Sequence, residues 1–111
     1  MGEQVTEVFT HDLIRGLVYP GVLLLGSKLY LFGGQYSEEQ RLSKAVLELD
    51  LSTFSVRQVG ELRDPGLNHA VVFNRGEFLV LTGETGREPL LSFFTRDFQR
   101  RDVKISTPIE F

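Results

Sequence analysis

Two histidines are the side chains of this sequence best suited to bind a metal ion or to transfer a proton. They are His11 and His69, and the carboxylates of Glu61 and Asp64 precede the second of them. A metal site would have to combine both histidines with one of these carboxylates. The simpler interpretation gives His69 a structural role, with its ring hydrogen-bonded to backbone groups. We adopt it, and the sequence then predicts no metal site.

Carboxylates and glycines suggest two further kinds of chemistry. No spacing singles out an acid pair of the glycosidase type among the loop carboxylates, which are Glu38, Glu39, Glu61, Asp64, Glu84 and Glu88. Glycines at 33–34 and 83–86 are of the kind found in phosphate-binding loops. However, neither stretch precedes a helical pattern or belongs to a G-x-x-x-x-G-K-[ST] motif. The sequence therefore predicts turns at strand ends, no catalytic residue and no cofactor.

Four basic residues close to the C-terminus raise the question of RNA binding; they are Arg96, Arg100, Arg101 and Lys104. The whole chain has a net charge of −3 and a pI near 5.3, whereas a general nucleic-acid binder carries a basic surface. Lysine and arginine on an outer strand also protect its edge against aggregation. We therefore predict an edge function for these residues and no nucleic-acid partner.

The composition is that of a globular protein from a reducing compartment. Hydrophobic residues make up 41% and charged residues 24% of the 111 residues, enough for one small domain. The absence of cysteine removes disulfides, metal–thiolate sites and a cysteine nucleophile, and favours a cytoplasmic location. Residues 1–12 lack the apolar run of a signal peptide, and the stretch 21–34 is too short and interrupted to cross a bilayer. We expect no membrane contact.

Short apolar runs separated by turn residues indicate β-strands. Residues 22–25 and 29–32 form one pair of runs, and residues 71–73 and 78–81 form another. Unbroken apolar runs of this length fit strands that are covered on both faces. Residues 45–51 alternate instead, with the even-numbered residues on the more polar side. No window has the periodicity of an amphipathic helix, so the predicted class is all-β.

The chain also contains an internal repeat of about 45–50 residues. A shift of 49 superimposes the first pair of apolar runs on the second pair. A shift of 44 then places Leu49 on Phe93 and Arg57 on Arg101. We assign the difference between the two shifts to a single loop, because loops absorb insertions more readily than strands do.

The repeat divides the chain into units of four strands. The loop that absorbs the length difference spans residues 35–44 in the first copy and 84–89 in the second. Residues 5–14 match the last strand of the first copy at a shift of 48, so they are predicted to form the outer strand of a preceding unit. The chain is then a single β domain over residues 1–111, with that strand at 5–14, one unit at 15–62, a second at 63–105 and a tail at 106–111.

A four-stranded unit of this length is typical of a β-propeller blade, and the first copy resembles a kelch repeat. The resemblance rests on residues 28–34, an apolar strand that ends in a double glycine, on residues 49–53, and on Arg63. The Leu-Asp pair of residues 49–53 stands for the Tyr-Asp of the family, and Val56 stands for its Trp. In the second copy, residues 82–83 (Thr-Gly) stand for the double glycine.

The resemblance implies a protein-binding scaffold rather than an enzyme, because kelch-like propellers mostly bind other proteins. Some propellers similar to kelch are copper oxidases with a Tyr–Cys crosslink, for which this chain has no cysteine. One functional alternative stays open: a subunit of a propeller enzyme with its active site shared at an oligomer interface. The alternative fold is a small closed β-barrel built from a duplicated half.

Two blades would leave two apolar faces open, whereas propellers close with about 4–8 blades. We therefore expect a homo-oligomer or a larger complex, in which copies of this chain or another protein supply the remaining blades. Antiparallel order places the connections 35–44, 60–68 and 84–89 on one side. Because arginine and tyrosine are favoured at protein interfaces, the predicted partner-binding residues come from these connections: Tyr36, Glu38, Arg41, Arg63, Asn68 and Arg87.

Overall fold

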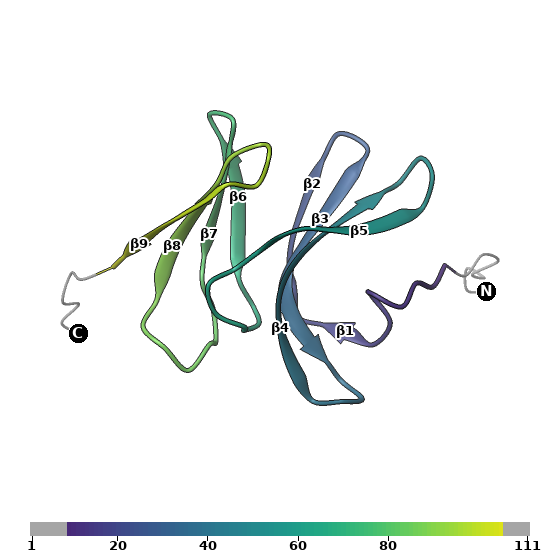
Figure 1. The fold of residues 1–111 in the computed structure, drawn as a ribbon, viewed down its shortest axis with the longest axis horizontal. Helices are drawn as coiled ribbons and strands as arrows, with labels where there is room; N and C mark the ends of the chain where they lie inside the picture. The colour runs from purple at the N-terminus through teal and green to yellow at the C-terminus, as the bar shows by residue number, and fades with distance from the viewer. Residues whose placement is uncertain (1–8, 106–111) are drawn as a thin grey trace, which may run out of the picture.

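A computed structural model describes residues 9–105, which form nine β-strands in two antiparallel sheets (Figure 1). The first sheet contains β1 (Leu17–Val18), β2 (Gly21–Leu25), β3 (Lys28–Tyr36), β4 (Arg41–Asp50) and β5 (Ser55–Glu61). The second sheet contains β6 (Ala70–Asn74), β7 (Glu77–Leu81), β8 (Leu90–Phe94) and β9 (Arg100–Lys104). The prediction of an all-β chain with two four-stranded antiparallel sheets and one extra strand is confirmed. The described residues include no helix that is long and apolar enough to cross a membrane.

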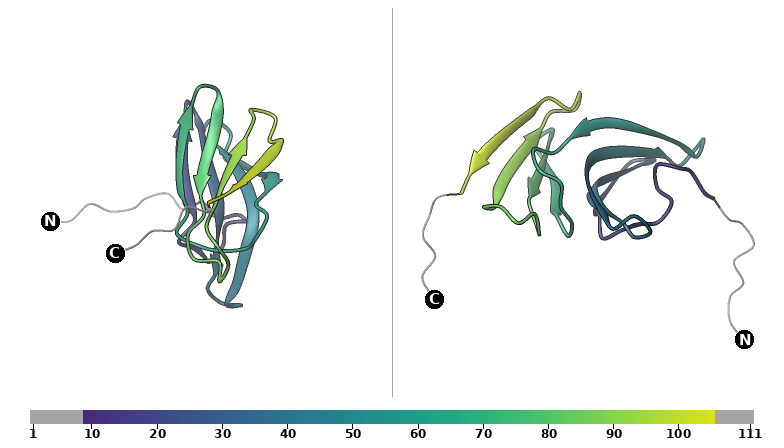
Figure 2. Two further views of the ribbon diagram at one scale, coloured as in Figure 1. Left: turned by 90° about the vertical axis from the view of Figure 1, so that its left-hand side faces the viewer. Right: turned by 60° about the horizontal axis from the view of Figure 1, so that its bottom comes forward.

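The two sheets lie side by side and are not closed into a barrel (Figure 2). Each sheet follows chain order, β2-β3-β4-β5 and β6-β7-β8-β9, and β2 and β6 are the strands through which the sheets meet. Within the described part of the chain, the only β-bridge outside the named strands joins Leu67 to Glu84. The alternative prediction of a small closed barrel is therefore wrong.

The extra strand is not where the sequence predicted it. Of the predicted strand 5–14, residues 5–8 lie outside the described residues, and residues 9–14 lead into a turn instead of a strand. Two backbone N–H groups of this turn donate to the carbonyl oxygen of His11. The extra strand is β1, where Leu17 pairs with Tyr36 at the far end of β3. A strand requires a neighbour with free backbone groups. On this edge of β3, free groups remain only beyond the end of its pairing with β2, and β1 pairs with them.

The connection predicted over residues 35–44 is wrong in its extent. β3 continues to Tyr36 and β4 begins at Arg41, so the turn between them covers only residues 37–40. Residues 37–40 form the exposed tip of this extended hairpin. The polar sequence therefore correctly indicated exposure, but it gave no sign that the backbone at both ends of this segment is paired in strands.

Strand register corrects the repeat alignment by one residue. Leu29 pairs with Leu49, and its counterpart 49 residues later, Phe78, pairs with Phe94. Leu49 therefore corresponds to Phe94 and not to Phe93, because a one-residue slip turns every side chain of a strand to the opposite face. Part of the length difference must then lie in the turn before the last strand of each sheet, and the single-loop assignment is wrong.

The core lies between the two sheets and is rich in aromatic rings. Its buried residues are Tyr30, Phe32, Val46, Leu62, Phe78, Val80 and Phe94. Phe78 is central, because its ring centroid lies 4.9 Å from that of Tyr30 across the interface and 5.2 Å from that of Phe98. A Cβ added at Gly21 on β2 would lie 2.8 Å from the carbonyl oxygen of His69, so the glycine allows close approach of the second sheet.

The outward faces of both sheets remain apolar and exposed near β2 and β6. Val22 and Leu24 on β2 are 52% and 58% exposed, and Val72 on β6 is 56% exposed. The prediction that these apolar strands are covered on both faces is therefore wrong for the chain by itself. Two sheets share one interface, so each covers only one face of the other.

Candidate partner-binding end of the sheets

Three connections lie together at one end of the sheets, which we call the connection end: residues 37–40, 62–69 and 82–89. The opposite end, the hairpin end, carries the short turns at 26–27, 51–54, 75–76 and 95–99. The antiparallel order of the strands makes this division inevitable, and Figure 1 shows the connection end at its lower edge. The arrangement agrees with the prediction that the polar connections share one side.

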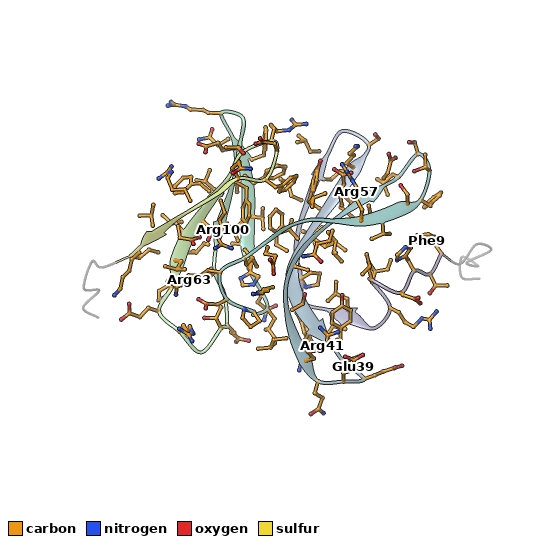
Figure 3. The ribbon with its side chains drawn as sticks, in the orientation of Figure 1. Phe9, Glu39, Arg41, Arg57, Arg63 and Arg100 are labelled. Carbon is orange, nitrogen blue, oxygen red and sulfur yellow. The ribbon has the colours of Figure 1, made fainter. Side chains whose placement is uncertain are left out.

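Tyr36 and Arg41 form the first group at the connection end, on the extended β3–β4 hairpin. The guanidinium carbon of Arg41 lies 4.6 Å from the centre of the Tyr36 ring, a cation–π contact. Arg41 Nε also donates to Glu39 Oε2 at 2.8 Å, and Figure 3 shows these two side chains together at the tip of the first sheet. Burial raises the pKa of Tyr36, whose hydroxyl donates to the carbonyl of Leu13 at 2.5 Å. An open depression of about 320 Å³ lies beside this group.

Arg63 and Arg87 form the second group, and Asp64 joins them. Arg63 Nη2 lies 2.8 Å from Asp64 Oδ2, and Arg87 Nε lies 3.5 Å from Asp64 Oδ1. The Asp64 side chain is only 12% exposed, whereas those of the two arginines that it pairs with are 42% and 68% exposed. Both arginines line an open depression of about 500 Å³, which Lys104 and Glu88 border.

The remaining two predicted residues have different surroundings. Glu38 lies in the exposed turn of the β3–β4 hairpin, beside the depression that Tyr36 and Arg41 line. Asn68 lies in the connection 62–69, and its side-chain amide donates weakly to Glu84 Oε2 at 3.5 Å. The structure thus gathers Tyr36, Glu38 and Arg41 in one group and Arg63 and Arg87 in another, while Asn68 belongs to neither.

Sequence reasoning missed several residues of both groups. Asp12 and Arg15 line the depression beside Tyr36, because the N-terminal turn packs against the extended hairpin. Asp64 joins Arg63 to Arg87, 24 positions apart in sequence, and no periodic signal connects them. A usable signal existed only for Asp64, whose position directly after Arg63 made their pairing foreseeable.

The four basic residues near the C-terminus all have partners within the chain. Arg100 joins the sheets, because its Nη1 donates to the carbonyl oxygen of Glu61 on β5 at 2.8 Å (Figure 3). Arg101 lies over the ring of Phe93 at 4.2 Å. The other contacts are those of Arg96 with the Phe73 ring and of Lys104 with Glu88. These residues are therefore engaged at the edge strand β9 and in contacts between neighbouring elements.

His69 connects three backbone segments at the connection end. It is 5% exposed, and its Nδ1 accepts the N–H of Gly83 at 2.9 Å, which confirms the predicted hydrogen bond to backbone. Its Nε2 is buried without a well-formed hydrogen bond, and the nearby Gly66 carbonyl accepts the N–H of Gly34 at 2.8 Å. Among the described residues, no group of three histidines, cysteines or carboxylates is arranged to hold a metal ion.

Burial lowers the pKa of His69 below its ordinary value, although an interaction with the Gly66 backbone opposes the shift. The unfolded chain therefore binds a proton at higher pH than the folded chain does. The stability contributed by neutral His69 is fully present above pH 6.5 and is lost as the pH falls through the lower folded pKa. We expect the free energy of unfolding, measured in urea, to decrease between pH 7 and pH 5.

The matched variants His69→Asn and His11→Asn test this origin of the pH dependence. Asparagine at position 69 keeps an acceptor for the Gly83 N–H and removes the titrating ring. We expect His69→Asn to flatten the slope between pH 7 and pH 5, and His11→Asn to leave it unchanged. Equal slopes for the wild type and His69→Asn would refute the assignment.

No protein-family model matches the chain, and no curated protein matches it significantly. The case for a function therefore rests on the geometry of the sheets and of the connection end. That geometry presents two open, mixed-charge depressions, both lined by arginines and one of them also by Tyr36.

Proposed function

We propose that the chain is part of a kelch-like β-propeller and works as a protein-binding scaffold whose connection end contacts the partner. The observation that carries this proposal is the gathering of the polar connections of both sheets at one end. Two four-stranded antiparallel sheets that meet through their first full strands are the arrangement expected of neighbouring blades. A rigid pair of sheets then holds the contact residues in fixed positions.

The chemistry of the connection end suits a polar protein surface. Tyr36 and Arg41 present a stacked aromatic ring and cation, and Arg63 and Arg87 present two cations fixed by one carboxylate. Tyrosine and arginine contribute most often to binding energy at protein interfaces. The depressions beside them are open, as shallow contact surfaces between proteins are, and their mixture of acids and bases gives specificity by charge complementarity. The lack of cysteine supports a cytoplasmic setting for this scaffold.

Removing two arginines from the connection end tests the proposal. The variant Arg41→Ala/Arg63→Ala deletes one cation from each group, and the immobilised chain is used to capture and cross-link proteins from its own cells. We expect the specifically captured partner to decrease roughly tenfold or more, because an interface arginine often contributes over 1 kcal/mol. Quantitative mass spectrometry of the cross-linked species measures the change and identifies the contact peptides.

The control removes two arginines from the hairpin end, with Arg75→Asn/Arg96→Ala. This variant has the same net charge as the first, and asparagine tolerates the positive φ of 51° at position 75. Capture is expected to stay at the wild-type level. Capture that is unaffected by the connection-end variant, or reduced equally by both variants, would contradict a partner site at the connection end.

A further inference from the structure

The outward faces of the two sheets carry matching sets of apolar side chains. On the first sheet this face is formed by Val22, Leu24, Leu29, Leu31, Leu47, Leu49 and Val56. On the second sheet it is formed by Val72, Leu79, Leu81, Leu91, Phe93, Arg101 and Val103. Strand pairing assigns each set to one face, because residues paired across neighbouring strands point to the same side.

The two outward faces correspond to the two sides of the interface that already exists inside the chain. The hairpins Leu25–Lys28 and Asn74–Glu77 close in the same way, which fixes a correspondence of 49 residues. Val72 and Leu79 on the outward face of the second sheet thus occupy the positions that Leu23 and Tyr30 occupy on the inner face of the first. In the same way, Val22 and Leu29 occupy the positions of Val71 and Phe78.

We propose that a second copy of the chain docks head to tail, with the outward face of its first sheet against the outward face of the second sheet. This inference rests on the proposed function, since it names the source of the missing propeller blades. The new interface repeats the internal one, so the internal contact between the sheets is its template. Its two sides differ, which makes the interface heterologous and capable of closing into a ring.

The template requires exposed apolar residues of β2 and β6 at the centre of the contact. Inside the chain, β2 meets β6 through Leu23 and Leu25 on one side and Val71 and Phe73 on the other. The corresponding residues between copies are Val72 on β6, 56% exposed, and Val22 and Leu24 on β2, 52% and 58% exposed. Strands β2 and β6 are thus left apolar and open where the next sheet would meet them, whereas Leu47 and Leu49 on β4 are only 2% and 8% exposed.

An aromatic residue of the template also has an exposed counterpart. Phe98 lies in the turn before β9 with a φ of 62°, and its ring centroid lies 5.6 Å from that of Tyr30 across the internal interface. Phe54 holds the same place in the first sheet with a φ of 56°, and it is 51% exposed. Its ring contacts only Phe9, at a centroid distance of 5.3 Å, among the aromatic rings of residues 9–105. A second copy would give Phe54 the contact that Phe98 already makes.

The size of one interface favours a closed ring over an open pair. The four strands of the second sheet, each five residues long and about 4.8 Å apart, give a footprint of only roughly 300 Å², so a single contact is small. In a ring every copy uses both faces, and the last contact forms without further loss of translational freedom. Since propellers have about 4–8 blades, two to four copies would complete one.

The molar mass in solution tests the proposal, using the purified full chain alone. Light scattering on a sizing column is expected to give two, three or four times the chain mass of 12.6 kDa. Val22→Asp and Val72→Asp each place a charge on one face only, and each is expected to weaken assembly at least about tenfold. Arg75→Asp is the control, because aspartate suits the positive φ of this hairpin turn, away from both faces.

Mixing the two defective variants identifies the head-to-tail arrangement. The intact face of Val22→Asp fits the intact face of Val72→Asp, so the mixture at high protein concentration forms a 1:1 complex and nothing larger. A monomeric wild type, assembly that survives either substitution, or a mixture without the 1:1 complex at the highest soluble concentration overturns the proposal. Partner capture by a monomeric chain would refute this inference alone, whereas assembly without capture through the connection end would refute the proposed function alone.

Discussion

Replacing Phe78 by alanine is expected to lower the free energy of unfolding by about 3–5 kcal/mol. Phe78 is fully buried, and its ring packs on Tyr30 of the first sheet and on Phe73 and Phe98 of the second. Truncation removes apolar contacts from both sheets at once and leaves a cavity that rigid strands cannot close. Urea denaturation followed by circular dichroism measures the loss. The effect should be large because, among the aromatic rings of residues 9–105, none contacts more rings than Phe78 does.

The conservative variant Phe78→Leu and the exposed control Phe54→Ala separate packing from general damage. Phe78→Leu keeps most of the apolar volume and is expected to retain much of the stability. Phe54 is half exposed, so its truncation should cost far less than that of Phe78. If Phe78→Ala cost no more than Phe54→Ala, the two sheets would not share the core described above.

The strands could be predicted from the sequence because each apolar run ends at a turn residue. Residues 29–32 and 78–81 lie within β3 and β7, and the two-residue turns at 26–27 and 75–76 contain glycine in positive φ. The alternation of residues 45–51 was also interpreted with the right parity, since Val46 and Glu48 share one face of β4. Local signals thus determined which segments are strands and which side chains point together.

Register and long-range polar contacts could not be predicted, because they depend on neighbours distant in sequence. Glu48 was assigned to the more polar side of its strand, yet it is 6% exposed and accepts hydrogen bonds from Tyr30 and Arg57 at 3.1 and 3.0 Å. Burial alone would raise the pKa of Glu48, but these hydrogen bonds and the charges of Arg57 and Lys28 lower it. The face that seemed more polar therefore turns toward the second sheet.

The candidate site was predictable in its location and not in its connections. Antiparallel order alone assigned Arg41 and Arg63 to the same end of the sheets, and the structure has them there. The pairing of Arg63 and Arg87 through Asp64 depends on how two connections pack together. Periodicity contains no information about such packing, because connections have no repeating geometry.

Substituting alanine for Gly33 is expected to destabilise the chain more than the same change at Gly26. Gly33 has a φ of 67° at a bulge in β3, and an added Cβ would lie 2.7 Å from the Gly66 carbonyl oxygen and 2.8 Å from His69 Nε2. Gly26 has a φ of 62°, and nothing lies within 4 Å of an added Cβ. The left-handed backbone costs both variants about 1–2 kcal/mol. Only Gly33→Ala adds a steric term, of about 1–3 kcal/mol.

The difference in the free energy of unfolding between the two variants, measured by urea denaturation, isolates the contribution of Gly33 beyond its positive φ. Gly33 lets the end of β3 approach the connection 62–69, where His69 in turn accepts the N–H of Gly83. Gly33→Ala should therefore also displace His69 and reduce the pH dependence assigned to that residue, whereas Gly26→Ala should leave it intact. Equal losses of stability in the two variants would show that backbone conformation alone accounts for Gly33. A larger loss with an altered pH slope would instead tie the double glycine to the packing of the connection end.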